Sequence, residues 1–360
     1  MAKADYLPQL DVLCHHFASG HVLHLYHAEG KGYYRANGIY PVFSRTNHSP
    51  KVITGLMHDV HKVGTATTFD VIRALAEWVA AGNVPEEFPL TMVYQCDQSF
   101  FAGYYSLGAA YRKKKGLKPY PKDVTEFQDL IGKIVRPGGG TPTALFHLLA
   151  HKHGLTDRVN LSLEVNGFDP TKINLTGVEE FDVKSYSRMM LDGTLDVYSK
   201  PIFGHGQFLG RDEKEGEGLQ HVAFSTVDAG IPPVYGVGII ARKDFVRDHD
   251  DMLRAFLMAI DKAMPECIAN PDYSVRVMNE MRGLGEEYDR IEGIKGAITA
   301  GKHPEITGYH YGFYESDDTR LHGHGFGYIN DDMLARMIGM LDDAGMLSAP
   351  VNPRDLYTRI

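Results

Sequence analysis

Short apolar segments alternate with amphipathic ones along most of this chain of 360 residues. Segments typical of strands lie at 10–13, 39–43, 62–66 and 90–95, and again at 133–136, 161–165, 195–198 and 233–242. Segments typical of helices separate them, at 20–31, 50–61, 70–81, 143–153, 186–191, 245–264 and 333–341. Such alternation is characteristic of parallel sheets joined by helical crossovers. The sequence therefore predicts an α/β fold.

The two halves of the chain share one local order of elements. A helix, a tight turn, a strand and a loop of small polar residues occur at 54–68 and again at 187–197. This repetition predicts two α/β lobes whose loops face each other. In open α/β sheets a ligand lies beyond the carboxyl ends of the strands, so we expect a cleft between the lobes to hold it.

Composition narrows the class of partner. The chain has 46 acidic and 37 basic residues, which argues against nucleic acid or an anionic membrane surface as a partner. No apolar run approaches the roughly 20 residues of a membrane span. Three widely spaced cysteines and the absence of a recognisable signal peptide suit a cytoplasmic protein. A periplasmic location is the alternative if a signal peptide has been removed.

Several stretches in sequence order resemble one known family. They are EGKGYYRANGI at 29–39, DLIGKIV at 129–135, GTLDV at 193–197, YGVGIIARKDF at 235–245, and Gly327-Tyr328 with PVNPRDLY at 350–357. Together they are similar to the nitrate-, sulfonate- and taurine-type substrate-binding proteins, a family that includes the thiamine-pyrimidine synthases. The resemblance covers nearly the full length. It implies a two-lobed clamp of the type II periplasmic-binding-protein fold, with a double hinge crossing.

The same resemblance suggests where the lobes begin and end. Residues 1–102 would form the first part of lobe 1, residues 103–235 lobe 2, and residues 236–360 the return to lobe 1 with the C-terminal helices. It also argues against pyrimidine-synthase chemistry. Those enzymes carry a lysine and a histidine in the loop where this chain has Ala66 and Asp70, and a cysteine cluster where residues 229–233 have none.

Histidines form the first group of candidate site residues. His15, His16 and His21 follow the first predicted strand, at the start of a helix, where an anion is favoured. They could bind a carboxylate, act as acid or base, or ligate a metal; the alternative is a structural role. His205 and Lys200 follow a strand of the second lobe, where the alternative is an exposed loop.

Two further loops of the first lobe carry polar candidates. Thr67 and Thr68 can contact a ligand or cap the following helix, and Asp70 can orient a histidine or receive a proton. Asp97 and Gln98 follow a buried strand and are expected near the mouth of the cleft.

A glycine-rich turn of the second lobe is the strongest candidate for anion binding. The stretch from Gly139 and Gly140 to Thr141 and Thr143 reads as a helix start whose free amides suit a carboxylate, sulfonate or phosphate. It lacks the Gly-Lys-Ser/Thr ending of a P-loop, and a purely structural turn is the alternative. Tyr235, at the start of the hinge-return stretch, completes the expected ligand-binding set.

Metal binding has one weak signal. His147 and His151 lie four residues apart on a predicted helix, a spacing that suits two ligands of one ion, but no third ligand is indicated. We therefore expect no cofactor, with a metal as the alternative.

Two functions remain open. The absence of a signal peptide and the ionisable loops favour a cytosolic, cofactor-independent enzyme. We expect a lyase or decarboxylase acting on a small cyclic carboxylic acid, with His15, His16, His21 and His205 as acid or base and hinge closure excluding water. The alternative is the substrate-binding protein of an ABC transporter for a small organic anion or heterocycle. In either case the partner is a small molecule, and a homo-oligomer is possible.

Overall fold

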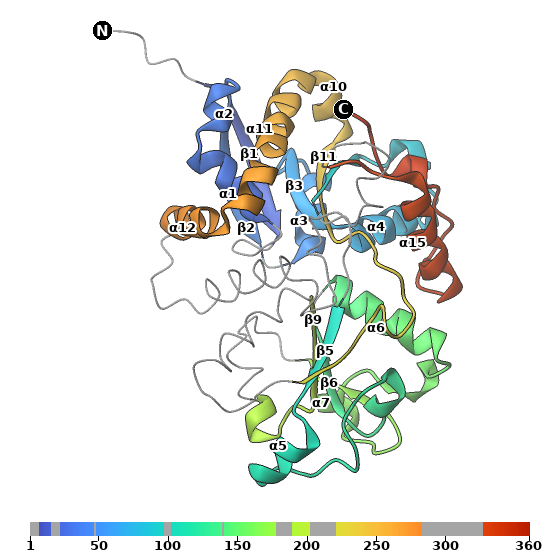
Figure 1. The fold of residues 1–360 in the computed structure, drawn as a ribbon. Coiled ribbons are helices and arrows are strands. Elements are labelled where there is room, and N and C mark those ends of the chain that lie inside the picture. The colour runs from blue at the N-terminus through green and yellow to red at the C-terminus, as the bar shows by residue number, and fades with distance from the viewer. Residues whose placement is uncertain are drawn as a thin grey trace. The chain divides into compact units, whose positions relative to one another are not determined.

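The computed structural model describes residues 7–15, 22–46, 48–96, 102–138, 140–177, 189–201, 221–282 and 327–360. They belong to two compact units, of which unit 1 comprises Met1–Ser99 and Val234–Ile360, and unit 2 comprises Phe100–Pro233. The chain leaves unit 1 once and returns to it once (Figure 1). This is the double crossing that the resemblance implies. The boundaries between the units that were predicted from the sequence lie after residues 102 and 235.

Unit 1 contains a five-stranded mixed sheet. Its order is β2 (Tyr40–Thr46), β1 (Gln9–His15), β3 (Val63–Thr67), β11 (Val237–Arg242) and β4 (Leu90–Gln95). β1 runs parallel to β2 and β3, whereas β11 is antiparallel to both β3 and β4. The sequence predicted parallel sheets, whereas β11 makes the sheet of this unit mixed. Because β11 alone is reversed, the carboxyl ends of β1, β3 and β4 all lie at the same edge of the sheet.

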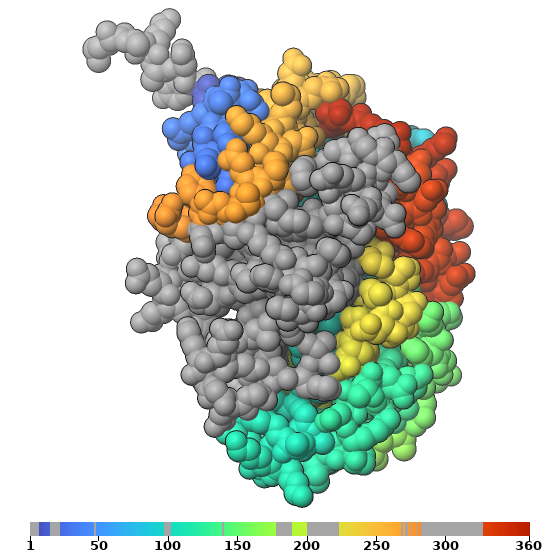
Figure 2. All heavy atoms as spheres, in the orientation of Figure 1, coloured from blue at the N-terminus to red at the C-terminus, as the bar shows by residue number. Residues whose placement is uncertain are grey.

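Helices cover this sheet. Their bounds are α1 (Leu23–Gly30), α2 (Tyr33–Ala36), α3 (Ser49–Met57), α4 (Thr68–Ala80), α10 (Lys243–Asp248), α11 (Asp250–Ala269), α12 (Pro271–Arg282) and α15 (Asp331–Asp343). α1 packs on α11 and α12, while α3 and α4 pack against β3 (Figure 1). The Tyr34 ring stacks on that of Phe256, with centroids 5.3 Å apart. α15 buries its apolar face, and its outer side forms part of the surface of unit 1 with the C-terminal segment, both red in Figure 2.

The expected helix at 245–264 is two helices. α10 closes with the His249 N–H bonded to the Phe245 carbonyl at 2.8 Å, and His249 leaves the helical region with φ −138° and ψ 37°. α11 then begins with Asp250 and Asp251, whose negative charges stabilise a helix amino terminus. The apolar periodicity continues across this break, which is why the sequence pattern predicted one helix.

Unit 2 contains a six-stranded mixed sheet. Its order is β10 (His221–Ser225), β5 (Ala102–Ser106), β9 (Val197–Pro201), β6 (Ile134–Pro137), β8 (Ile173–Leu175) and β7 (Val159–Asn160). β6 is parallel to β8 and β9, and β5 is antiparallel to β9 and β10. Its helices include α5 (Ala109–Lys114), α6 (Thr141–Lys152) and α7 (Leu163–Asn166). The sequence predicted neither β5 nor β10.

The predicted strand at 161–165 is wrong. The short helix α7 lies there instead, because the Ser162 side chain accepts the Val165 N–H at 3.3 Å and caps the turn. Leu161 and Val165 are 69% and 82% exposed, so this apolar run is not a buried strand. In the described part of the chain, no helix is long and apolar enough to cross a membrane.

Candidate functional site

Hydrogen bonds on Gly138 and Thr143 hold the start of α6 in unit 2. The Gly138 N–H donates to the Ser199 carbonyl at 2.8 Å, which ties the turn to β9. The Thr143 hydroxyl donates back to the Gly138 carbonyl at 2.6 Å. Gly140, which precedes the helix, has φ 67° and ψ −125°, a conformation open almost only to glycine. Gly138 and Gly140 therefore shape the approach to α6.

Thr141 is the first residue of α6, and it is buried. The residue is 2% exposed, and its Oγ1 hydrogen-bonds to no group in the described ranges. A buried hydroxyl without a partner costs roughly 1–3 kcal/mol. The carbonyl of Gly140 accepts the N–H groups of Thr143 and Ala144, at 3.1 and 3.2 Å. The Thr141 N–H group lies at the amino end of this 12-residue helix. The helix dipole favours a negative charge at that end.

The other predicted residues of this edge are less fully described. Lys200 belongs to β9 and pairs with Gly103 of β5, but its side chain lies outside the described atoms. Gly139 and His205 lie outside the described residues altogether. The structure thus brings Gly140, Thr141 and Thr143 together at the carboxyl end of β6, next to the strand that carries Lys200.

In unit 1, Thr67 and Asp70 are bonded to each other. The Thr67 hydroxyl caps α4 by accepting the Asp70 N–H at 3.3 Å, and it donates to Asp70 Oδ2 at 2.6 Å. The Thr67 N–H donates to the Ser49 hydroxyl at 2.9 Å. The capping interpretation of Thr67 is therefore confirmed, while a contact of either residue with a ligand stays a prediction.

Thr68 is similarly satisfied within unit 1. Its hydroxyl is within 3.1 Å of both Gln95 Oε1 and the Gly236 carbonyl. Gln95 also donates through Nε2 to the Val237 carbonyl at 2.9 Å and is fully buried. These bonds hold the ends of β3, β11 and β4 together.

Tyr235 is buried in unit 1 and serves the packing of α15. Its hydroxyl accepts the Asn330 N–H at 2.8 Å, at the start of that helix. Burial raises the pKa of the phenol to about 12. His15 ends β1, where its backbone pairs with Thr46, but its side chain is not described. The remaining predicted residues, His16, His21, Asp97 and Gln98, lie outside the described residues.

Metal ligation has no support within the described ranges, where no three His, Cys, Asp or Glu side chains lie close enough to hold an ion. His147 and His151 both lie on α6 as predicted. The expectation of a cofactor-independent protein stays a prediction.

One polar cluster of unit 1 was not predicted. His27 of α1 is 1% exposed, with Nδ1 at 2.6 Å from the Ser274 hydroxyl and Nε2 at 3.3 Å from Glu266 Oε2. Tyr33 also donates to Glu266, and this bond raises the Tyr33 pKa to about 12. Burial lowers the pKa of His27. The cluster joins α1 to α11 and α12, and its only signal in the sequence is the helical position of His27.

A second unpredicted cluster lies in unit 2 and consists of Arg112, Lys118, Tyr120, Lys133 and Asp196; we call it the Tyr120 cluster. Arg112 is fully buried, and its Nη2 lies 3.3 Å from Asp196 Oδ1. The Tyr120 hydroxyl donates to the same oxygen at 2.6 Å. Asp196 is the aspartate of the GTLDV stretch, but nothing in the sequence indicates its partners.

Solved structures of other proteins have a similar fold. The alkanesulfonate-binding protein SsuA from Xanthomonas axonopodis pv. citri, bound to MOPS, matches with a TM-score of 0.59 at 11% identity, over 98% of each chain. The periplasmic aliphatic sulphonate binding protein SsuA from Escherichia coli matches with a TM-score of 0.57 at 12% identity, over 97% of each chain. The desulfurization enzyme DSZB matches with a TM-score of 0.53 at 11% identity, over 98% of this chain and 96% of that one. The chain therefore has the type II periplasmic-binding-protein fold.

One family model matches part of the sequence. The family model described as NMT1/THI5 like matches residues 106–274. This match confirms the resemblance found in the sequence. It spans unit 2 from the end of β5 and continues through β11 to the start of α12. Among curated proteins, no sequence matches this chain.

Proposed function

We propose that this chain reversibly binds a small organic anion through the start of α6, and that it serves as the substrate-binding protein of a transporter. One observation carries the proposal, namely the buried Thr141 hydroxyl at the amino end of α6 without a partner among the described residues. An anion that accepts this hydroxyl and the Thr141 N–H would satisfy both donors.

The strength of such a site fits reversible capture. A helix amino terminus favours an anion by roughly 0.3–1 kcal/mol, and up to about 2 kcal/mol where it is partly buried. A hydrogen bond to a charged group adds about 1.5–3 kcal/mol. These donors are neutral, so they select for an acceptor without requiring proton transfer. Lys200 on neighbouring β9 would add a positive charge if its amine turns toward α6.

The comparisons support an anion as the ligand. Both SsuA proteins are described as sulfonate-binding, and one holds MOPS, itself a sulfonate. Carboxylate and sulfonate share the acceptor geometry that a hydroxyl and a backbone amide recognise. By the same analogy the protein would act in the periplasm rather than in the cytoplasm.

An enzymatic role is the second candidate, because the desulfurization enzyme DSZB shares the fold. A cytosolic lyase or decarboxylase would use His15, His16, His21 and His205 as acids or bases and Asp70 as their orienter. Asp70 Oδ2 is bonded to Thr67, so Oδ1 would take that role.

Native mass spectrometry of the freshly purified protein distinguishes the two. The released ligand is identified, added back and recovered after incubation. Recovery of an unchanged anion supports the binding protein. Loss of the mass of CO₂ or water from the ligand contradicts it and favours the lyase.

A further inference from the structure

The segment from Ala109 to Lys122 concentrates positive charge. Its sequence, AAYRKKKGLKPYPK, contains six basic residues and no acidic one, although the whole chain has a net charge of −9. The rest of the chain holds 31 basic and 46 acidic residues and therefore carries a charge of −15. An anionic surface that would repel the chain as a whole can attract this part of unit 2.

The fold places the lysines of this segment on the outside of unit 2. Tyr111 and Leu117 pack against the hydrophobic core, and Arg112 is fully buried. Figure 2 shows this part of the chain, in teal, on the surface of unit 2. Four lysines between and after the three inward-facing residues are exposed, and we call them the lysine patch: Lys113, Lys114, Lys115 and Lys118.

Hydrogen bonds fold the segment back on itself. Arg112 Nε donates to the Lys118 carbonyl at 2.9 Å, and the Leu117 N–H donates to the Arg112 carbonyl at 2.9 Å. Gly116 turns the chain between them with φ 68°. Lys118 is therefore held beside the carboxyl end of α5, where the other three lysines of the patch lie.

The charge of the patch is not neutralised from within unit 2. Lys113, Lys114 and Lys118 form no ion pair with an acidic side chain among the described residues. Asp123, the first acidic residue after the segment, serves the other end of α5, where it accepts the Ala109 N–H at 2.6 Å. The positive charge is therefore available to a partner outside the chain.

Exposed apolar side chains border the lysine patch. Phe168 is 44% exposed, and Lys118 Nζ lies 5.2 Å from the centroid of its ring. Leu161 and Val165 precede Phe168 in the same short segment and are more exposed still. Lysines next to exposed large apolar side chains are typical of surfaces that lie at a membrane interface. A nucleic acid would pair with the lysines but would leave the aliphatic side chains in water.

We propose that the lysine patch and Phe168 form a docking surface for an anionic phospholipid bilayer, on which unit 2 rests without spanning it. The anionic headgroups supply the negative charge that the patch lacks, and they act within a Debye length, roughly 10 Å at 0.1 M salt. The Phe168 ring enters the boundary between headgroups and acyl chains. This docking does not depend on the ligand that binds at the start of α6.

Vesicle flotation of the full-length chain provides the first test. One set of vesicles consists of phosphatidylcholine, and the other contains phosphatidylglycerol as well. We expect the chain to float with the anionic vesicles and not with the neutral ones, and the bound fraction to fall as added salt screens the lysines. Equal binding to both sets, or binding to neither, would overturn the proposal.

Two triple variants with the same change in net charge locate the contact. Combining Lys113→Gln, Lys114→Gln and Lys118→Gln should weaken binding to anionic vesicles by about tenfold or more, because each lysine near such a surface contributes about fivefold in affinity. The control replaces three exposed basic residues of unit 1 by glutamine and should bind as the wild type does: Lys51, Arg73 and Arg354. Equal weakening in both variants would show a response to net charge alone and contradict the patch.

Phe168→Ala distinguishes a bilayer from a nucleic acid. Loss of the exposed ring should weaken binding to anionic vesicles several-fold, since the ring contributes apolar contact that headgroup charge cannot replace. Unchanged vesicle binding in this variant would overturn the bilayer as the partner. Tighter binding of the wild type to a mixed-sequence RNA oligonucleotide than to the vesicles would overturn it as well.

Discussion

Gly327 lies so close to the ring of Tyr94 that a Cβ at this position would stand 2.1 Å from Tyr94 Cε2. The Gln95 N–H donates to the Gly327 carbonyl at 3.0 Å, so β4 and the segment that leads into α15 are joined here. Gly327 also has φ +78°, which disfavours any side chain. Both the space and the backbone therefore require glycine.

Gly327→Ala should destabilise unit 1 by at least about 2 kcal/mol, since backbone strain and overpacking each cost roughly 1–3 kcal/mol. Gly82→Ala is the matched control, because Gly82 has φ +86° but a Cβ added there would meet no atom within 4 Å. That variant should lose only the cost of the strained backbone, about 1 kcal/mol. Urea unfolding of both variants checks this. Equal losses would show that the Tyr94 ring yields easily.

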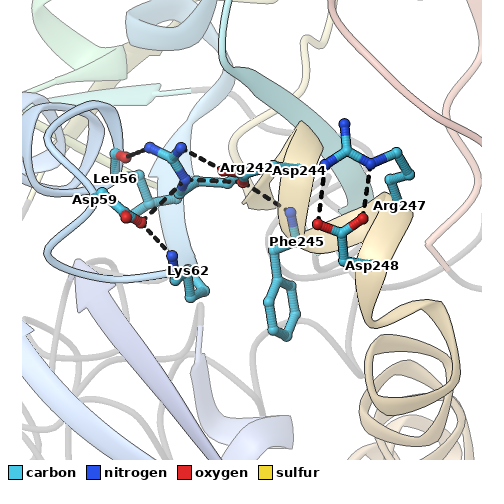
Figure 3. Close-up of polar contacts among 8 residues, drawn as sticks. All are labelled: Leu56, Asp59, Lys62, Arg242, Asp244, Phe245, Arg247 and Asp248. Carbon is cyan, nitrogen blue, oxygen red and sulfur yellow. Dashed lines mark hydrogen bonds and ion pairs between the residues drawn. The ribbon is translucent and has the colours of Figure 1, made fainter.

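Arg242 joins three parts of unit 1, as Figure 3 shows. Its Nη1 donates to the Leu56 carbonyl at 2.9 Å, its Nε and Nη2 contact Asp244, and its Nε lies 3.2 Å from Asp59 Oδ1. A lysine cannot reproduce this planar fork. We expect Arg242→Lys to cost about 1–3 kcal/mol of unfolding free energy.

Arg247 provides the comparison for Arg242. It pairs with its neighbour Asp248 at the exposed end of α10, where its side chain is 73% accessible (Figure 3). Exposed ion pairs contribute roughly 0–1 kcal/mol. Arg247→Lys should therefore change stability by less than about 0.5 kcal/mol. If urea unfolding shows the same loss of unfolding free energy in both lysine variants, Arg242 does not join these parts of unit 1 as proposed.

The cap of α4 depends on one hydroxyl. Thr67→Ala removes the acceptor for the Asp70 N–H and should cost about 1 kcal/mol. Thr67→Ser keeps the hydroxyl and should recover most of that loss. Thermal unfolding of the three proteins provides the measurement, and an alanine variant as stable as the serine variant would contradict the capping role.

Glu164 makes unit 2 sensitive to acid. Its carboxylate accepts hydrogen bonds from the Thr176 hydroxyl at 2.6 Å and from the Gly177 N–H at 3.0 Å, which lower its pKa to about 2. A carboxyl whose pKa is lower in the folded than in the unfolded state stabilises the fold above its unfolded pKa of 4.5. That contribution is lost as the pH falls from about 4.5 toward about 2.

Glu164→Gln tests this pH dependence. The variant cannot ionise at this position, so its stability should fall less steeply than that of the wild type over the same acidic interval. Urea unfolding at a series of pH values measures the difference between the two proteins. A constant difference at every pH would show that the Glu164 carboxylate makes no pH-dependent contribution.

The sequence predicted β4 most accurately among the strands. The ends of β4 match the prediction, since Leu90–Gln95 is a continuous buried run. The direction of β11 was not predictable, because an apolar run contains no signal for the orientation of its neighbours. β5 depends on partners far along the chain, such as Thr226, whose hydroxyl accepts the Ala102 N–H at 3.2 Å.

The candidate site was predicted only where local chemistry determines it. Gly140 and Pro142 mark the start of α6, and turn and cap preferences alone place them. The burial of Thr141 is a tertiary property, and so is the approach of Arg112 to Asp196. Neither follows from residue types at short spacing.

The central claim is that the start of α6 binds the ligand. Isothermal titration calorimetry tests it with the anion recovered from the protein or, if none is recovered, with the tightest binder among methanesulfonate, MOPS, acetate and benzoate. Thr141→Val keeps the shape of the side chain but removes the hydroxyl. Thr125→Val is the control, since that hydroxyl already donates to Asp129 in unit 2.

We predict that Thr141→Val weakens binding by about tenfold or more, because roughly 1.4 kcal/mol of hydrogen bonding corresponds to a factor of ten. Thr125→Val should bind as the wild type does. Unchanged affinity in Thr141→Val, with both variants folded, would contradict the account.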